Sequence, residues 1–220
     1  MKKKTITYQD VPLFDGIAEK SLEAMLHCLQ HNRKEYTKGS YILLEEECVQ
    51  YIGIVLRGRV HMLKEDIWGE QTLLTYMGPG EVFGETFALR KEQRSYVSYM
   101  AAEDCEIMFL ALDKLLHPCP RSCSFHTQLS QNMYDLMGEK NIRLMERIEV
   151  ASKSTLREKL LAYLSLQAQK QGARSFTVPL SRTEMAQYLQ SNRSAMTREL
   201  SAMRAEGILD FDGNTFQLKE

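Results

Sequence analysis

The sequence predicts an α+β fold: an antiparallel β-roll, then a long helix, then a compact helical unit with a terminal β-hairpin. Three observations indicate this. Apolar residues mostly alternate with polar ones from about residue 36 to 110, which is the period of β-strands. From about residue 124 to 151 the apolar spacing changes to three and four residues, which is the period of a helix. The last third contains two capping boxes and a strong hairpin signal.

A short helix and a set of short strands are expected in the first half. Residues 19–30, EKSLEAMLHCLQ, have apolar side chains at helical spacing. In residues 51–64, YIGIVLRGRVHMLK, apolar side chains occupy alternate positions on both sides of an Arg57-Gly58 turn. Short strands separated by turn residues predict an antiparallel sandwich or roll. The other strands are expected at 71–76, 95–102 and 105–112.

One long helix is expected over residues 124–151. Gly138 lies inside it and costs about 1 kcal/mol of helix propensity relative to alanine. The apolar stripe of this helix can pack on its own domain, or against a second copy of the helix as in a coiled coil. We expect the second arrangement. The candidate dimerisation residues are Leu129, Met133, Leu136, Leu144 and Ile148.

The last third is expected to contain three helices and a hairpin. A capping box at Thr155–Glu158 opens the first helix, and Gly172 closes it. A second box at Ser181–Glu184 opens the next helix, and a third helix runs from about Arg193 to Glu206. The residues that follow alternate around Asp212-Gly213, which predicts a two-stranded hairpin.

The third of these helices has one face suited to reading DNA. Met196, Leu200 and Met203 recur at i, i+4 and i+7, so we expect them to face the core. The opposite face then carries arginines and short hydroxyl side chains and no acid. Arginine can donate two hydrogen bonds to guanine, and serine or threonine can reach a base or a phosphate. A plain three-helix cap with a solvated face is the alternative, and the order helix, turn, helix, hairpin argues against it. The candidates are Arg193, Ser194, Thr197 and Arg198 for bases, with Ser181 and Arg182 against the phosphate backbone.

Composition and charge limit the functional classes. Hydrophobic residues make up 44% and charged residues 26%, as in a folded soluble protein. The sequence has no apolar run of about 18 residues and no signal peptide, so we expect reduced thiols and a cytoplasmic location. The net charge is −1, but residues 152–220 carry 10 Lys and Arg against 7 Asp and Glu, and the remainder carries 18 against 22. This asymmetry favours nucleic-acid contact by the last third, although a chance fluctuation of surface charge would give the same numbers.

The stretch HPCPRSCSFH, residues 117–126, has several interpretations. Cys119 and Cys123 have plausible metal-ligand spacing, and His117 or His126 could complete a set of four ligands. The two prolines and the serines also make a good helix start. A thiol at a helix N-terminus is acidified, which suits a redox switch. We rank a structural helix entry or a thiol switch first, and a metal site second.

The ordered set of elements resembles the bacterial CRP/FNR superfamily, the relatives of the cyclic-AMP receptor protein and the fumarate–nitrate regulator. The resemblance covers essentially the whole chain and implies three parts. These are a cyclic-nucleotide-binding-like β-roll or jelly roll at 1–121, a dimerisation helix at 122–151 and a winged helix-turn-helix DNA-binding domain at 152–220. It implies an effector-responsive transcription regulator that binds a two-fold related DNA site as a homodimer. The implied partners are double-stranded DNA, a second copy of the chain and RNA polymerase, with no membrane.

Within this resemblance, GEVFGE (80–85) followed by Arg94-Ser95 is similar to the family's phosphate-binding cassette. In nucleotide-binding relatives the cassette's backbone and arginine hold the cyclic phosphate, and its glutamate holds the ribose. Here Tyr96 stands where those relatives carry a small residue, and the loop is one residue short. We therefore expect a structural remnant, with Glu85 and Arg94 paired, or a ligand other than cyclic AMP. The effector-pocket candidates are Gly84, Glu85, Thr86, Arg94 and Ser95.

An enzyme is the main alternative class. The sequence has no G-x-S-x-G, H-E-x-x-H, Walker or G-x-G-x-x-G motif. A cupin-like activity in the β-roll would need several histidines among its strands, and the strand-rich block at about 36–110 offers His61 alone. A regulatory subunit that binds a cyclic nucleotide without DNA is a third class, which the hairpin and the arginine-bearing helix argue against.

Overall fold

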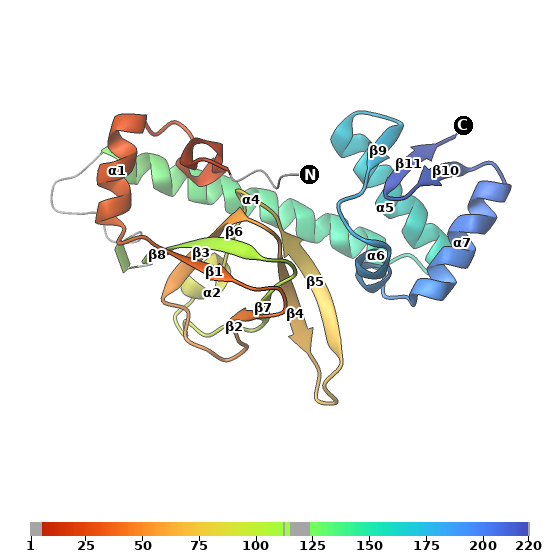
Figure 1. Ribbon diagram of the computed structural model, residues 1–220, viewed down its shortest axis with the longest axis horizontal. Coiled ribbons are helices and arrows are strands. Elements are labelled where there is room, and N and C mark those ends of the chain that lie inside the picture. The colour runs from red at the N-terminus through yellow and green to blue at the C-terminus, as the bar shows by residue number, and fades with distance from the viewer. Residues whose placement is uncertain (1–5, 112, 115–123, 220) are drawn as a thin grey trace. The chain divides into compact units, whose positions relative to one another are not determined.

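The computed structural model describes residues 6–111, 113–114 and 124–219 (Figure 1). It has two compact units, Met1–Gly138 and Glu139–Glu220, and their boundary lies inside helix α4, Ser124–Ala151. The first unit also contains η1 (Tyr8–Asp10), η2 (Pro12–Phe14), α1 (Glu19–Cys28), β1 (Asn32–Tyr36), β2 (Tyr41–Leu43), β3 (Tyr51–Arg57), β4 (Val60–Glu65), β5 (Gln71–Met77), β6 (Val82–Phe83), α2 (Glu85–Ala88), β7 (Ser98–Ala101) and β8 (Cys105–Ala111). The second contains α5 (Leu156–Gln171), β9 (Ser175–Thr177), α6 (Arg182–Tyr188), α7 (Arg193–Ala205), β10 (Leu209–Asp212) and β11 (Thr215–Leu218). The predicted α+β fold, with a β-roll, a long helix and a winged helix-turn-helix, is confirmed.

The β-roll consists of two antiparallel four-stranded sheets. Their strand orders are β1-β8-β3-β6 and β2-β7-β4-β5. Ile52, Ile54 and Leu56 share one face of β3 as predicted, but Gly53 and Val55 on the other face are buried too. Side chains of α1 and of the first part of α4 join the same apolar core as the strands. The sheet that contains β3 is therefore covered on both faces at this strand. For this reason the sequence of β3 is apolar almost throughout.

The chain changes sheets at the Arg57-Gly58 turn. β3 belongs to one sheet and β4 to the other. Gly58 has φ +89°, and a Cβ there would lie 2.5 Å from the carbonyl oxygen of Asp104. A left-handed backbone and a close approach both require glycine at this crossing.

The predicted strand at 95–102 begins later than expected, at Ser98. The amide of Ser95 donates to the carbonyl of Glu47, and the amide of Glu46 donates to the carbonyl of Ser95. The residues before β7 are therefore tied to the turn at 46–49. This pairing brings Arg94, of the cassette-like segment, beside Cys48.

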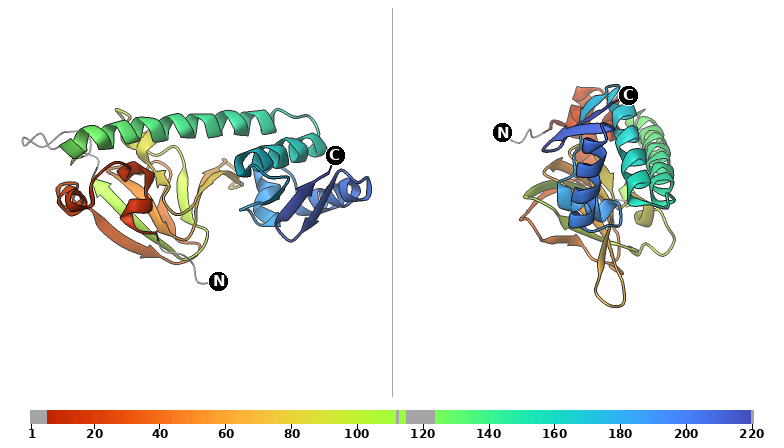
Figure 2. Two further views of the ribbon diagram at one scale, coloured as in Figure 1. Left: turned by 90° about the horizontal axis from the view of Figure 1, so that it is seen from above. Right: turned by 90° about the vertical axis from the view of Figure 1, so that its right-hand side faces the viewer.

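The long helix has the predicted bounds and runs without a break through Gly138 (Figure 2). A Cβ at Gly138 would meet nothing within 4 Å, so this glycine is not required by packing. In the part of the chain described by the structure, no helix combines the length and the apolar character that a membrane span needs.

The second unit confirms the predicted caps. The side chains of Thr155 and Ser181 accept hydrogen bonds from the third amides of their helices, and Gly172 closes α5 with φ +59°. Gly213 begins the two-residue turn between β10 and β11, with φ +53°. The short strand β9 adds to β11 and was not predicted, because three residues are too few to show a period.

Candidate DNA-reading face and effector pocket

Helix α7 presents the face that the sequence predicts. Met196, Leu200 and Met203 are 0%, 1% and 0% exposed, so they fix the orientation of the helix. The side of α7 away from these three is exposed to solvent. The exposed residues on it include Arg193, Ser194, Thr197, Arg198 and Ser201.

The two arginines of this face differ from the other arginines of the second unit. Arg193 and Arg198 make no side-chain hydrogen bond or ion pair among the residues that the structure describes, so their guanidinium groups are available to a ligand. Arg204, on the same helix, pairs instead with Asp210 at 2.8 Å. The free positive charge of α7 is therefore concentrated at its N-terminal half.

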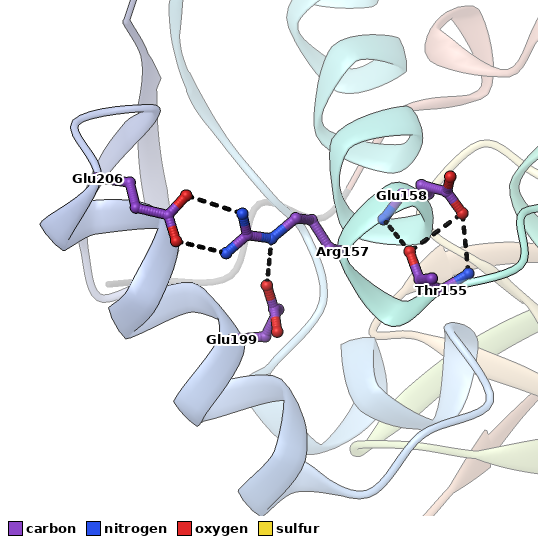
Figure 3. A network of polar contacts seen from close by, with 5 residues as sticks. All are labelled: Thr155, Arg157, Glu158, Glu199 and Glu206. Carbon is purple, nitrogen blue, oxygen red and sulfur yellow. Dashed lines mark hydrogen bonds and ion pairs between the residues drawn. The ribbon is translucent and has the colours of Figure 1, made fainter.

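The acids of α7 are neutralised by one arginine of α5 (Figure 3). Both terminal nitrogens of Arg157 donate to Glu206 at 2.7 Å, and its Nε donates to Glu199 at 2.5 Å. This bidentate pairing raises the pKa of Arg157 and lowers the pKa of Glu206. The network holds α7 against the start of α5 and removes unpaired negative charge from the helix that carries the two arginines.

The hydroxyl groups of the α7 face are partly occupied by their own helix. Thr197 Oγ1 donates to the carbonyl of Arg193 at 2.8 Å, and Ser201 Oγ donates to the carbonyl of Thr197 at 2.9 Å. In these rotamers they offer a ligand acceptor lone pairs, and Thr197 also offers its methyl group. The side chain of Ser194 makes no hydrogen bond with any described residue and is free to donate or accept.

Arg182 has a role that the sequence did not indicate. Its guanidinium lies over the rings of Phe211 and Phe216, 4.9 and 4.5 Å from their centroids, and donates to the carbonyl of Gly213 at 2.7 Å. Burial lowers the pKa of this side chain. Arg182 therefore binds the hairpin formed by β10 and β11 in this structure, which differs from the prediction that it lies against DNA phosphate. Ser181 is exposed but serves as the N-cap of α6.

The cassette-like segment forms a glycine turn and a short helix. Gly84 has φ +85° and precedes α2. The Glu85 side chain is 3% exposed, and its carboxylate accepts a hydrogen bond from Thr86 Oγ1 at 3.1 Å. Tyr99, which the sequence did not single out, is buried beside it. Burial, together with the charge of Glu85, raises the pKa of Tyr99, and a hydrogen bond with the backbone of Gly84 opposes this shift. Glu85 is therefore enclosed by side chains of the roll.

The predicted pairing of Glu85 with Arg94 is wrong. Arg94 is exposed, and its guanidinium donates to the carbonyl of Glu46 at 2.8 Å, with no ion pair to any described residue. Ser95 is fully buried, and its hydroxyl donates to the carbonyl of Val97 at 2.6 Å. The segment keeps a glycine turn and a short helix, but Arg94 and Ser95 form their hydrogen bonds with the roll itself.

The predicted dimerisation stripe divides into two faces of α4. Leu129 and Met133 are 1% and 5% exposed and belong to the core of the β-roll, and Leu136 packs against the same core. Their assignment to an interface between copies is therefore corrected, because these side chains have little surface left to bury. Leu144 and Ile148 remain exposed, at 54% and 67%.

The stretch that contains His117, Cys119 and Cys123 lies outside the described residues. His126, at the start of α4, is buried and lies against the ring of Phe125. Within the described ranges there is no cluster of three or more His, Cys, Asp or Glu side chains that could hold a metal ion. The metal, thiol-switch and helix-entry interpretations of Cys119 and Cys123 stay predictions.

Comparison with known families agrees with this architecture. The family model of the cyclic nucleotide-binding domain matches residues 33–121, and that of the Crp-like helix-turn-helix domain matches residues 158–220. Between them the two models cover more than half of the chain, in the order that the fold shows.

Individual relatives share the same layout. The cyclic AMP receptor protein of Thermus thermophilus is 26% identical over 209 residues, which cover 95% of this chain and 93% of the relative. Among solved structures, FixK2 from Bradyrhizobium japonicum aligns with a TM-score of 0.67 and 20% identity, covering 86% of this chain and 93% of that one. The c-di-GMP responsive regulator CLP of Xanthomonas campestris aligns with a TM-score of 0.68 and 18% identity, covering 92% and 100%. These two structural similarities show that the chain shares the fold of both proteins. With both family models matched in order, the chain belongs to the CRP/FNR superfamily of transcription regulators, with a cyclic-nucleotide-binding-type domain and a DNA-binding helix-turn-helix.

Proposed function

We propose that this protein regulates transcription as a homodimer that reads a two-fold related DNA site with α7 and responds to an effector other than cyclic AMP. The observation that carries the proposal is the electrostatic state of α7. Arg193 and Arg198 have no partner among the described residues, while the acids Glu199 and Glu206 are bound by Arg157. A helix with free guanidinium groups on one face and neutralised acids suits the major groove.

Base reading is assigned to four side chains of α7. Arg193 and Arg198 are proposed to contact guanine, since a guanidinium can donate two parallel hydrogen bonds to its O6 and N7 atoms. Ser194 can donate or accept, and Thr197 can accept or place its methyl group against thymine. Several relatives use an acidic base-reading residue, which would fall at Ser194. The preferred DNA site is therefore expected to differ from theirs.

Selection from randomised double-stranded DNA tests this function. We expect the wild-type protein to enrich an inverted repeat with half-sites about one helical turn, 10–10.5 base pairs, apart or a multiple of that distance. Enrichment of no sequence at moderate salt would contradict specific DNA reading. Enrichment of a single half-site would contradict the two-fold arrangement.

The dimer is proposed to form through an exposed row on α4. Tyr134, Met137, Leu144 and Ile148 are 70%, 38%, 54% and 67% exposed. Together with Asn141 they recur at steps of three, four, three and four residues, which is the a/d pattern of a coiled coil. A single asparagine at an a position fixes the register of two helices. This row replaces the stripe that the sequence predicted, and it retains Leu144 and Ile148.

The effector is proposed not to be cyclic AMP. Arg94 and Ser95, which would face a cyclic phosphate in the family's cassette, are hydrogen-bonded to Glu46 and Val97. Glu85 is enclosed beside Tyr99. A nucleotide would have to displace these internal contacts before it gained its own. Contact with RNA polymerase is part of the same proposal and follows from the family's role in transcription.

A further inference from the structure

The β-roll contains a cavity of about 250 Å³ that borders the start of the cassette-like segment, where Phe83 and Gly84 line it. It is lined by residues of β1, β2, β6 and β8 and by residues 48–51. Of the cassette residues that the sequence singled out, Gly84 lines it, and Glu85, Thr86, Arg94 and Ser95 do not. The cavity therefore borders the cassette-like segment without including its glutamate or its arginine.

One wall of the cavity is polar and cationic. Asn32, Lys34 and Tyr36 occupy alternate positions of β1 and so share one face of the strand. Within the described part of the chain, none of their side chains makes a hydrogen bond or an ion pair. Lys34 is the one charged residue among the described lining residues. The mouth of the cavity therefore offers a free ammonium group, an amide and a phenol, with no acid to neutralise them.

Aromatic rings lie on the same face of the sheet as these polar side chains, because Phe109 is paired with Asn32 in β1 and β8, and both Phe109 and Phe83 are paired with Gly53. The ring of Phe109 lies 6.4 Å from that of Tyr36 and 6.5 Å from that of Phe83, both edge to face. A Cβ at Gly53 would lie 2.2 Å from the Phe83 ring, so glycine at this position lets the ring lie across β3. The hydroxyl of Tyr36 is protonated at neutral pH and able to donate, and burial raises its pKa further. Aromatic rings pack favourably edge to face or offset against one another.

We propose that this cavity binds a small monocarboxylate with a single aromatic ring. The carboxylate would pair with Lys34 and accept hydrogen bonds from Asn32 or Tyr36, and the ring would pack against Phe83 and Phe109. Hydrogen bonds from Lys34 and a neutral donor to an ionised carboxylate are stronger than hydrogen bonds to a neutral acceptor. The volume is below the usual range of about 300–1,000 Å³ for ligand pockets, which restricts the ligand to one ring. The proposal does not depend on which DNA sequence the protein reads.

Calorimetry on the full chain with phenylacetate tests the site. Benzylamine has a similar ring and the opposite charge, and acetate has the carboxylate without the ring. We expect phenylacetate to bind with a dissociation constant of about 1 mM or tighter, which isothermal titration can measure. Benzylamine and acetate are expected to bind at least about tenfold more weakly.

The matched variants are Lys34→Gln and Lys38→Gln. Lys38 is an exposed lysine of the same unit that does not line the cavity. Lys34→Gln is expected to weaken phenylacetate binding about tenfold or more, because it removes the charge partner and keeps a polar side chain of similar length. Lys38→Gln is expected to leave it unchanged. Absence of binding to the wild type, equal binding of benzylamine, or equal loss in both variants would overturn the proposal.

Discussion

Truncation of Leu144 to alanine tests the proposed dimer seam on α4. Complete burial of a leucine side chain is worth about 1.5–3 kcal/mol. Leu144 is 54% exposed, so an interface can bury about half of it, worth roughly 1 kcal/mol in each copy. A symmetric dimer contains the residue twice. Leu144→Ala should therefore cost about 2 kcal/mol of association free energy, which raises the dissociation constant about 30-fold.

The assay is sedimentation equilibrium over a range of protein concentrations, which gives the dissociation constant directly. The matched control is Ile142→Ala. Ile142 is 52% exposed and comparable in size, but it lies on the other side of α4, because two residues correspond to about 200° of helix rotation. The control should leave the dissociation constant within about a factor of two, since surface substitutions away from contacts usually change free energies by less than 0.5 kcal/mol. Equal effects of the two variants, or no effect of Leu144→Ala, would refute the reasoning.

Three further expectations follow from the polar contacts. Calorimetry with cyclic AMP should show no binding at micromolar concentration, and micromolar binding that is lost in Arg94→Ala would mean that the cassette is functional. Arg182→Ala should lower the stability of the DNA-binding unit by about 1–2 kcal/mol through lost cation–π contacts, measured by denaturant unfolding. It should leave the salt dependence of DNA binding unchanged, and a salt slope reduced by roughly one would instead place Arg182 on a phosphate. Glu206 has a lowered pKa in the folded state, so its contribution to stability is present at neutral pH and is lost as pH falls below about 4.3, the usual value for glutamate, toward the folded pKa. Unfolding curves of Glu206→Gln should depend less on pH in that range, and identical pH dependence of the two proteins would show that the ion pair contributes nothing.

Local signals in the sequence predicted the second unit closely. Each capping box pairs a hydroxyl with a glutamate three residues later, and that short-range chemistry is sufficient to begin a helix. The buried stripe of Met196, Leu200 and Met203 likewise fixes the orientation of α7 by itself. The exposed face of α7 could therefore be predicted from the sequence alone.

Contacts between distant segments were harder to predict. The strand β1, with the sequence NRKEY, shows no apolar alternation and is held in place by its pairing with β8, about 70 residues later in the chain. From the sequence, Arg94 was expected to pair with Glu85, and Arg182 to lie against DNA phosphate. The structure gives them the carbonyls of Glu46 and Gly213 as partners, and these lie 48 and 31 residues away.

The long helix shows a further limit of periodicity. Spacing alone places apolar residues on a helix, but it does not say which of two apolar faces a neighbouring domain covers. Leu129 and Met133 are covered by the β-roll, so the exposed row begins at Tyr134 and continues through Met137. Assigning each face required the burial of individual side chains.

The central claim is that the free arginines of α7 read bases. The most direct measurement is the affinity of wild type, Arg198→Ala and Arg204→Ala for the selected DNA site and for versions of it with single base-pair changes. Arg204 lies on the same helix but is paired with Asp210, so Arg204→Ala controls for loss of charge.

Arg198→Ala should lose about 1–3 kcal/mol on the selected site and lose its preference at one position of each half-site. Arg204→Ala should keep the wild-type preference at every position. If Arg198→Ala and Arg193→Ala both keep the full base preference of the wild type, these arginines do not read bases and the reading face has been assigned wrongly.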